Sequence, residues 1–341
     1  MGAYRSVVRP LAFLLPAEAA HRLAGAVLRL PLPWSRIGGT TRDPGLRVSL
    51  AGMELDNPVG MAAGFDKSCR FLDSLGELGF GYVVGGSVTR EPRTGNPKPR
   101  VARFPRQRSA VNAMGLPNAG AEAARRSLER LPRSAPRAAS LADERLDDLV
   151  RSHELLEPLV DAVELNVSCP NVAWGRDEHA EGFLRSAMER LGGIRTTPLF
   201  VKLPPYRTDR ERAAVLRLVR IAVDGGADAL TASNTYPVAS RAMATGAGGL
   251  SGRALFPDTV RIVGDLFRET EGRIPINACG GIFTAEDALA CIGAGATTVQ
   301  VYTGLIYEGP RIVRAITAGL AGAVAGARQP GGVQSLVGAR A

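Results

Sequence analysis

Short apolar runs alternate with longer amphipathic segments along most of the chain, from about residue 45 onward. Eight of these runs have the length and composition of buried strands, although the run at 136–142 is weak. They cover residues 57–64, 81–88, 136–142, 162–168, 199–204, 229–234, 275–281 and 298–304. Strands that alternate with helices in this way predict an α/β fold, a (β/α)8 TIM barrel. An open doubly wound sheet is the alternative, but no GxGxxG motif opens its first βα unit.

The first 40 residues follow a different pattern, in which apolar residues mix with arginines. Leu23, Val27 and Leu30 repeat at helical spacing, and Pro16 suits the start of a second helix. No apolar run here reaches the roughly 18–20 residues that span a bilayer. We expect two short amphipathic helices that lie on a membrane surface. A signal peptide is the other reading, but two prolines would interrupt its apolar region.

These patterns divide the chain into three parts. Residues 1–40 are the amphipathic helical segment, which would give access to the membrane, and residues 41–325 are the barrel. The Gly-rich residues 326–341 are expected to form a flexible tail.

Composition narrows the class of protein. The chain has 341 residues, of which 45% are hydrophobic, as in a globular protein. Its four cysteines are widely spaced and form no CxxC motif, which indicates reduced thiols in a cytosolic compartment. Three separated histidines give no ligand cluster, so we expect no metal. The net charge of +9 fits an anionic membrane surface better than nucleic acid, because no basic run is interleaved with aromatics.

The basic residues are almost all arginines. Of the 42 basic residues only Lys67, Lys98 and Lys202 are lysines. In such a chain a lysine suggests a site that needs a compact point charge. Lys67 and Lys202 lie at the ends of predicted strands, and Lys98 lies in the loop after the second strand.

Other polar residues also gather at the ends of the predicted strands, where barrel enzymes carry their chemistry. They are Ser87, Asn166, Cys169, Asn171, Asn234, Thr235, Tyr302 and Thr303. After the seventh strand, a Gly280–Gly281 turn precedes Thr284, a candidate helix N-cap, and Thr303–Gly304 repeats the design after the eighth. Helix starts at these two places form the usual phosphate site of a barrel, so a phosphorylated cofactor or substrate is expected.

The stretch ELNVSCPN, residues 164–171, illustrates the expected pocket. Its amides, hydroxyl and thiol follow an apolar run, and such groups are costly to bury unless they bind something. Taken alone, the stretch could also be a strand end with an inert, buried cysteine. The polar residues at the other strand ends favour the pocket.

Together these motifs resemble the dihydroorotate dehydrogenase family. The matching stretches run in the family's order over nearly the whole barrel: NPVGMAAGFDKS, GFGYVVGGSVTREPRTGNPKPR, VNAMGLPN, ELNVSCPN, LFVKLP, TASNTY, GGLSGRAL, INACGGI and QVYTGLIYEGP. TGNPKPR and the amphipathic N-terminus look like the quinone-linked, membrane-associated class 2. The resemblance implies an FMN-binding TIM barrel that oxidises dihydroorotate to orotate in de novo pyrimidine biosynthesis and passes electrons to a quinone. It also implies a peripheral protein at the cytoplasmic face of the cell membrane.

The resemblance assigns roles to residues at the strand ends. It implies that FMN is bound by Ala62, Ala63, Gly64, Ser87, Asn166, Lys202, Ser233, Gly252, Gly281, Tyr302 and Thr303. It implies that the substrate is bound by Lys67, Asn112, Ala113, Met114, Gly115, Leu116, Asn166, Asn171, Asn234 and Thr235. Asparagines with one lysine suit a dihydropyrimidine ring that carries a carboxylate.

Cys169 would be the catalytic base, with Lys202 and Asn166 as the other catalytic residues. A thiol, with a pKa near 8.5, ionises far more easily than a serine hydroxyl. Quinone-linked members of the family usually carry serine here, and cysteine is typical of the soluble class 1, as is NAMGLPN. The family's Asn-containing third-strand segment is also replaced, with Ser140 as the nearest polar residue. Lys98 has no role that the resemblance assigns.

Two other functions remain open from the sequence. One is an FMN enzyme that acts on a related dihydropyrimidine such as dihydrouracil, for which Lys67 would lack an anionic partner. The other is a non-catalytic, flavin-binding descendant of the enzyme. The presence of Cys169, Lys67 and Lys202 argues against the second.

Overall fold

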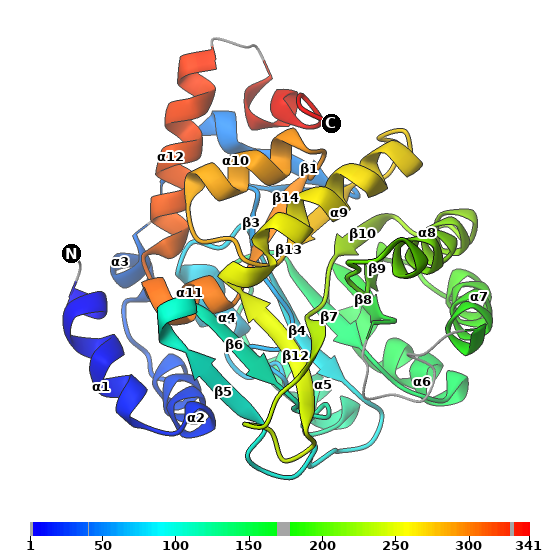
Figure 1. Cartoon of the computed structure of the whole chain (residues 1–341), viewed down its shortest axis with the longest axis horizontal. Helices are drawn as coiled ribbons and strands as arrows, with labels where there is room; N and C mark the ends of the chain where they lie inside the picture. The colour runs from blue at the N-terminus through cyan, green and yellow to red at the C-terminus, as the bar shows by residue number, and fades with distance from the viewer. Residues whose placement is uncertain (1–2, 40, 169–177, 328–330) are drawn as a thin grey trace.

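The computed structural model describes residues 3–39, 41–168, 178–327 and 331–341. Eight parallel strands close into a barrel in chain order (Figure 1). These strands are β3 (Val59–Met61), β4 (Tyr82–Val88), β7 (Arg137–Leu141), β8 (Ala162–Asn166), β9 (Leu199–Leu203), β10 (Ala229–Ala232), β13 (Ile276–Cys279) and β14 (Thr298–Val301). Each lies within one of the predicted runs, the weak one at 136–142 included. The TIM barrel is confirmed, and the open doubly wound sheet is wrong.

Helices cover the outside of the barrel. They are α4 (Leu72–Glu77), α5 (Ala121–Arg130), α6 (Leu146–Leu156), α7 (Glu178–Gly192), α8 (Asp209–Asp224), α9 (Phe256–Glu269), α10 (Ala285–Gly293), α11 (Thr303–Glu308) and α12 (Ile312–Ala327). Every residue of β4, β7, β8 and β9 is buried, because helices cover one face and the barrel interior covers the other. These strands are therefore mostly apolar in sequence, although β7 is weakly so and β8 and β9 each contain one charged residue.

Two small sheets were not predicted from the sequence. The strands β1 (Val48–Leu50) and β2 (Met53–Leu55) form an antiparallel hairpin before the barrel. A four-stranded antiparallel sheet has the order β11-β12-β6-β5, with β5 (Val101–Phe104), β6 (Ser109–Asn112), β11 (Tyr236–Ala239) and β12 (Ala247–Gly252). Its strands come from the connections after β4 and β10, and none of them is fully buried. They therefore lack the long apolar runs by which the barrel strands were predicted.

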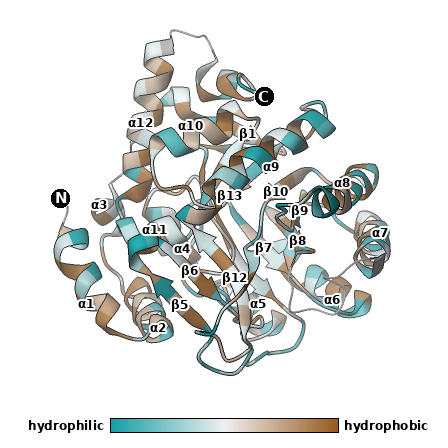
Figure 2. Cartoon of the chain, viewed as in Figure 1, coloured by the Kyte–Doolittle hydropathy of each residue, from teal (hydrophilic) through white to brown (hydrophobic). Residues whose placement is uncertain are grey.

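The N-terminal segment is helical, as predicted, and a short π-helix (Tyr4–Val8) opens it. It continues with α1 (Arg9–Leu14), α2 (Ala17–Leu28) and α3 (Trp34–Gly38). Among the described residues no helix is long and apolar enough to cross a membrane. Hydrophobic residues lie along α1 and α2 (Figure 2). Several of their side chains are exposed, with Leu14 at 82%, Leu11 at 61% and Leu23 at 53%. Part of the apolar surface of α1 and α2 is therefore not covered by the described part of the chain.

Polar contacts attach the N-terminal segment to the rest of the fold. Arg100 donates hydrogen bonds of 2.8 and 3.2 Å to the two carboxylate oxygens of Glu18, at the start of α2. Lys98, to which the resemblance assigns no role, lies 3.8 Å from the same carboxylate. Arg103 donates to the carbonyl groups of Ala12 and Leu15. The loop before β5 and the strand itself therefore fix the angle at which α1 and α2 meet.

The end of the chain packs against α10. Val333, in a short 3-10 helix (Gly332–Leu336), is 1% exposed. The amide of Gly338 donates to the carbonyl of Ile292 (3.0 Å), and the amide of Arg340 donates to that of Gly293 (2.7 Å). The described part of the predicted flexible tail thus has ordered contacts, and the boundaries of the three predicted parts stay a prediction.

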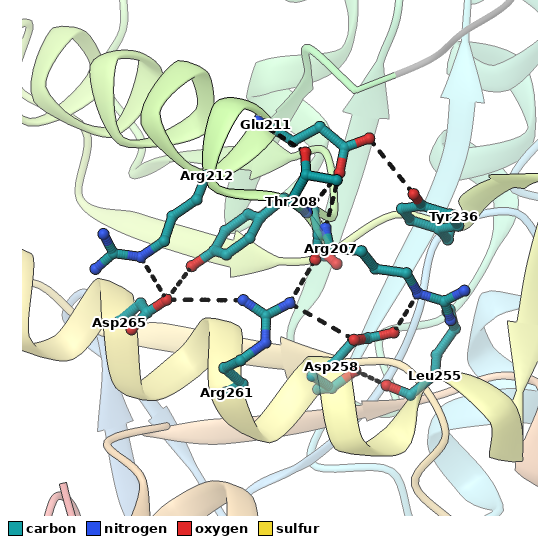
Figure 3. Close-up of polar contacts among 12 residues, drawn as sticks. Arg207, Thr208, Glu211, Arg212, Tyr236, Leu255, Asp258, Arg261 and Asp265 are labelled. Carbon is teal, nitrogen blue, oxygen red and sulfur yellow. Dashed lines mark hydrogen bonds and ion pairs between the residues drawn. The ribbon is translucent and has the colours of Figure 1, made fainter.

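A cluster of charges joins α8 to α9 on the outside of the barrel (Figure 3). Asp265 accepts hydrogen bonds from Tyr206 (2.7 Å), Arg212 (2.9 Å) and Arg268 (2.8 Å). Burial alone would raise the pKa of Asp265, but these three donors outweigh burial and hold its pKa below the usual value. A carboxyl whose pKa is lowered by folding stabilises the native state above its unfolded pKa of about 3.9, and that stability is lost as the pH falls through the folded pKa.

We predict that Asp265→Asn lowers the free energy of unfolding by about 2 kcal/mol near neutral pH, because an amide cannot accept from all three donors. The loss should shrink as the pH falls from about 4 through the lowered pKa of the folded carboxyl, because the wild type then loses the same stabilisation. Urea unfolding as a function of pH measures both effects. The control is Glu181→Gln, which breaks an exposed ion pair between α7 and α8 with Arg217 and should change stability by less than about 1 kcal/mol. An equal loss at all pH values would contradict this account of Asp265.

Candidate functional site

One cavity of about 1580 Å³ lies at the carboxyl ends of the barrel strands and extends to α1 and α2. It is larger than the roughly 300–1,000 Å³ of a pocket for one small ligand, so it has room for more than one. The predicted residues that line it are Ala63, Gly64, Lys67, Ser87, Asn112, Ala113, Met114, Gly115, Leu116, Asn166, Lys202, Asn234, Thr235, Tyr302 and Thr303. Ala62, Ser233, Gly252 and Gly281 do not line it. The first three are next in sequence to a residue that does, and Gly281 lies two residues before Phe283, which also lines it. Cys169 and Asn171 lie outside the described residues.

A chain of hydrogen bonds connects four strand ends across the floor of the cavity. The hydroxyl of Ser87 is 2.9 Å from that of Ser140 and accepts from the amide of Asn166 (2.9 Å). The oxygen of Asn166 accepts from the hydroxyl of Ser168 (2.6 Å), which in turn accepts from the amide of Asn234 (2.8 Å). The chain fixes the orientations of both asparagine amides, because each has a defined donor and acceptor partner. Ser140, where the family carries an Asn-containing segment, thus supports the site through Ser87.

Lys202 carries a buried charge with few partners. Its side chain is 6% exposed, and its ammonium lies 3.8 Å from the carboxylate of Glu164. Burial alone would lower the pKa of Lys202, but the carboxylate of Glu164 outweighs burial, and the net shift is upward. Among the described residues the ammonium has no hydrogen-bond acceptor in the protein within normal distance, so its protons are available to a ligand in the cavity.

Lys67 also lines the cavity, near His21 and Glu18 of α2. Its ammonium donates to the carbonyl of Gly64, and the loss of solvent around it lowers its pKa to about 8. His21, on α2, packs edge to face on Phe65, with ring centroids 5.1 Å apart. Burial, followed by the charge of Lys67, lowers the pKa of His21 to about 4, so this imidazole is neutral at physiological pH. Of these two neighbouring groups, Lys67 is therefore the one that carries a positive charge.

The predicted phosphate site is built from the loops after β13 and β14. Thr284 caps α10, accepting from the amide of Asp287 (3.2 Å), as predicted. Gly281 has a φ of +71°, and a Cβ there would meet the backbone nitrogen of Phe256 at 2.6 Å, so only glycine fits this close approach. Thr303 begins α11, and its hydroxyl is 3.2 Å from that of Ser251 in the four-stranded sheet. These loops place the hydroxyl-bearing residues Thr284 and Thr303 on the lining of the cavity.

Glu164 was missed by the sequence analysis. It precedes Asn166 by two residues in β8 and therefore faces the same side of the strand. It is 0% exposed and forms the ion pair with Lys202. A carboxylate within an apolar run is the signal that could have found it, because an unpaired carboxylate is too costly to bury.

The residues present fit a flavin mononucleotide. A buried ammonium without an acceptor suits the polar edge of the flavin ring, and glycine-rich loops with Thr303 suit its phosphate. Within the described ranges, no group of three or more His, Cys, Asp or Glu side chains could hold a metal ion. The fold and the site thus define a (β/α)8-barrel protein with a deep cofactor site at the carboxyl ends of its strands.

Comparison with known proteins gives the family. The family model described as dihydroorotate dehydrogenase matches residues 45–324. The chain is 39% identical over 334 residues to a dihydroorotate dehydrogenase (quinone) of Novosphingobium aromaticivorans, covering 92% of this chain and 93% of the relative. A relative with the same name from Erythrobacter litoralis is 39% identical over 328 residues, covering 92% and 94%. The chain belongs to the dihydroorotate dehydrogenase family.

A solved structure agrees with this assignment. Ligand-free DHODH from Eimeria tenella has a TM-score of 0.82 and 28% identity, and the match covers 95% of this chain and 99% of that one. The agreement extends beyond the barrel, since so large a share of the chain includes the four-stranded sheet and most of the N-terminal segment.

We predict that Ser140→Ala weakens FMN binding about fivefold, because Ser87 loses one of its two hydrogen-bond partners at a cost of about 1 kcal/mol. Fluorescence titration of the apoprotein with FMN measures the dissociation constant. Ser152→Ala is a matched control, since Ser152 is also buried and hydrogen bonded (to Asp143, 2.7 Å) but does not line the cavity. If both variants bound FMN as tightly as the wild type, Ser140 would have no part in the site.

Proposed function

We propose that this protein oxidises dihydroorotate to orotate in de novo pyrimidine biosynthesis, with FMN as its cofactor and a quinone as the electron acceptor. One observation carries the proposal: a single cavity connects the candidate FMN residues, the candidate substrate residues and the two N-terminal helices. The family assignment and the names of the relatives support it.

The substrate is a ring with two amide-like edges and one carboxylate. Asn112, Asn166 and Asn234 line the cavity and supply the amide donors and acceptors that such a ring needs. Asn171, outside the described residues, would complete the set. Lys67 lies on the same cavity and supplies the positive charge for the carboxylate. At physiological pH Lys67 stays largely protonated, because its pKa of about 8 is still above 7.

FMN supplies the chemistry of hydride acceptance from C6 of the substrate when it is bound. Lys202 would hold a positive charge at the polar edge of the flavin ring. The hydroxyl of Ser87 would donate or accept a hydrogen bond beside the ring. Ala63, Gly64 and Tyr302 line the cavity and would exclude water from the ring. Thr303 and the loops around Gly252 and Gly281 would bind the phosphate.

Cys169 would take the proton from C5 of the substrate. The thiol follows directly on Ser168, whose hydroxyl is held between Asn166 and Asn234. The hydroxyl proton of Ser168 is donated to Asn166. This hydrogen bond supports a role for Ser168 in orienting the turn rather than in accepting the substrate proton. Cysteine is also the more acidic group by several pKa units.

The N-terminal segment would bind the membrane and admit the quinone between α1 and α2. The exposed Leu11, Leu14 and Leu23 would enter the interface of the cytoplasmic leaflet. Arg22, Arg29 and Arg36 are exposed and would meet anionic headgroups. Arg5 and Arg9 contact the protein instead of the headgroups. Arg5 forms an ion pair with Glu308, and Arg9 donates a hydrogen bond to the carbonyl of Tyr307. This arrangement supports a peripheral protein.

A related dihydropyrimidine is the alternative substrate, since Cys169 also suits that chemistry. The charge of Lys67 distinguishes the two candidate substrates. An uncharged ring such as dihydrouracil would leave its partly buried ammonium without an anion.

We predict that Lys67→Ala weakens orotate binding by at least tenfold, because the carboxylate loses a charge-assisted partner. The perturbation of the flavin absorbance by orotate measures the affinity. Lys98→Ala is the control, since Lys98 is 59% exposed and its ammonium contacts Glu18 rather than the cavity. Unchanged orotate affinity in Lys67→Ala would favour the dihydrouracil alternative.

We predict that replacing Leu11, Leu14 and Leu23 together by serine lowers affinity for anionic vesicles by at least tenfold, because three exposed apolar side chains no longer enter the bilayer. Turnover with a lipid-soluble quinone should fall, while turnover with a small soluble dye should not change. Ile194→Ser is the control: it removes an exposed apolar side chain (42%) outside the N-terminal segment. An unchanged ratio of the two activities would show that the segment only supports the barrel.

A further inference from the structure

A carboxylate lies inside the barrel directly behind Lys202. Glu164 is 0% exposed, and one of its oxygens, Oε1, is 3.8 Å from the ammonium. Within the described ranges this oxygen has no hydrogen-bond partner. A buried carboxylate oxygen without a donor is costly, and a nearby positive charge is what offsets that cost. The ion pair is therefore the reason that both charges can be buried.

A directed chain of hydrogen bonds fixes the other oxygen of Glu164. Thr231 donates to Oε2 (2.9 Å) and accepts from the amide of Asn277 (3.3 Å). The oxygen of Asn277 accepts from Thr298 (2.6 Å), so the hydroxyl of Tyr82, 2.8 Å from Thr298, must be the donor in that last contact. The single hydroxyl proton of Thr231 is committed to Glu164. The five residues come from five strands, so the barrel wall itself holds the carboxylate in place.

The same layer of the barrel holds Lys202. Thr231 is in register with Lys202 on one side and with Asn277 on the other, and Asn277 is in register with Thr298. The ionisable groups that face the ammonium are Glu164 from β8 and Cys279 from β13. Burial raises the pKa of the Cys279 thiol, so this residue stays neutral. Glu164 is thus the counter-charge that the described part of the barrel offers to Lys202.

We propose that Glu164 is the positioning residue of Lys202, and that its carboxylate keeps the buried ammonium protonated and held at the edge of the cofactor. This inference rests on the proposed function only in that Lys202 is taken to face the flavin. Without Glu164, burial would favour the neutral amine, and the site would lose its positive charge as the pH rises. The raised pKa of Lys202 agrees with this arrangement.

The small number of lysines allows a direct test. Protein labelled with ¹³C at lysine Cε gives signals from only Lys67, Lys98 and Lys202, which Lys98→Arg and Lys67→Arg assign. The holoenzyme is titrated for the wild type, for Glu164→Gln and for Thr231→Val. Gln keeps the shape of Glu164 and an oxygen for Thr231, whereas Val removes the hydrogen bond to Glu164 and leaves its charge.

In the wild type, the Lys202 signal should stay that of an ammonium above the pH at which Lys67 titrates, about 8. In Glu164→Gln it should titrate about 1–3 pH units lower than in the wild type, the range that one nearby opposite charge produces. The rate of flavin reduction by dihydroorotate should then fall above the shifted pH and recover below it. Thr231→Val should leave the titration within a few tenths of a unit of the wild type.

An unchanged Lys202 titration in Glu164→Gln would overturn the inference, and so would equal shifts in Glu164→Gln and Thr231→Val, since packing rather than charge would then be responsible. If Glu164→Gln does not fold, Glu164→Asp keeps the charge but withdraws it by one methylene. It should shift the titration in the same direction by a smaller amount, and no shift would overturn the inference as well. The titration needs no substrate, so a failure of dihydroorotate to reduce the flavin would count against the proposed function alone.

Discussion

The closure of eight parallel strands is the constraint on which the rest of the structure depends. All eight carboxyl ends point to one side, so the polar residues that follow them surround a single cavity. The hydrogen-bond chain from Ser140 through Asn166 to Asn234 satisfies some of these residues and sets the directions of the others. The cavity is thus rigid at its floor, and its remaining donors and acceptors are available to ligands.

The same constraint explains why the two lysines of the cavity differ. Lys202 is inside the barrel, where burial would neutralise it, and Glu164 counters that effect. Lys67 is in a loop beside α2, and burial lowers its pKa to about 8, although Asp66 and Glu18 partly oppose this shift. An ammonium that stays protonated suits a cofactor that remains bound. An ammonium that loses its proton more easily suits a substrate carboxylate that binds and dissociates in each turnover. Arginine would not serve in either place, because its planar fork needs more room than one ammonium.

The sequence predicted the barrel well because each of its strands is buried on both faces and reads as a separate apolar run. It did not predict the sheet formed by β5, β6, β11 and β12, whose partly exposed strands pair across distant connections. Most candidate site residues line the cavity because motifs at strand ends are local in sequence. The partnership of Glu164 with Lys202 is not local, since it depends on the register of β8 against β9. Likewise, the ion pair of Arg5 with Glu308 joins residues that lie far apart in the sequence, so no local pattern predicts it.

The most direct test of the central claim is anaerobic mixing of the purified, FMN-loaded protein with dihydroorotate, followed by a quinone. The account predicts that the absorbance of oxidised flavin is lost on mixing with dihydroorotate and returns when the quinone is added. It predicts little loss with dihydrouracil, which has no carboxylate for Lys67. No loss of absorbance with dihydroorotate, or a faster loss with dihydrouracil, would contradict the account.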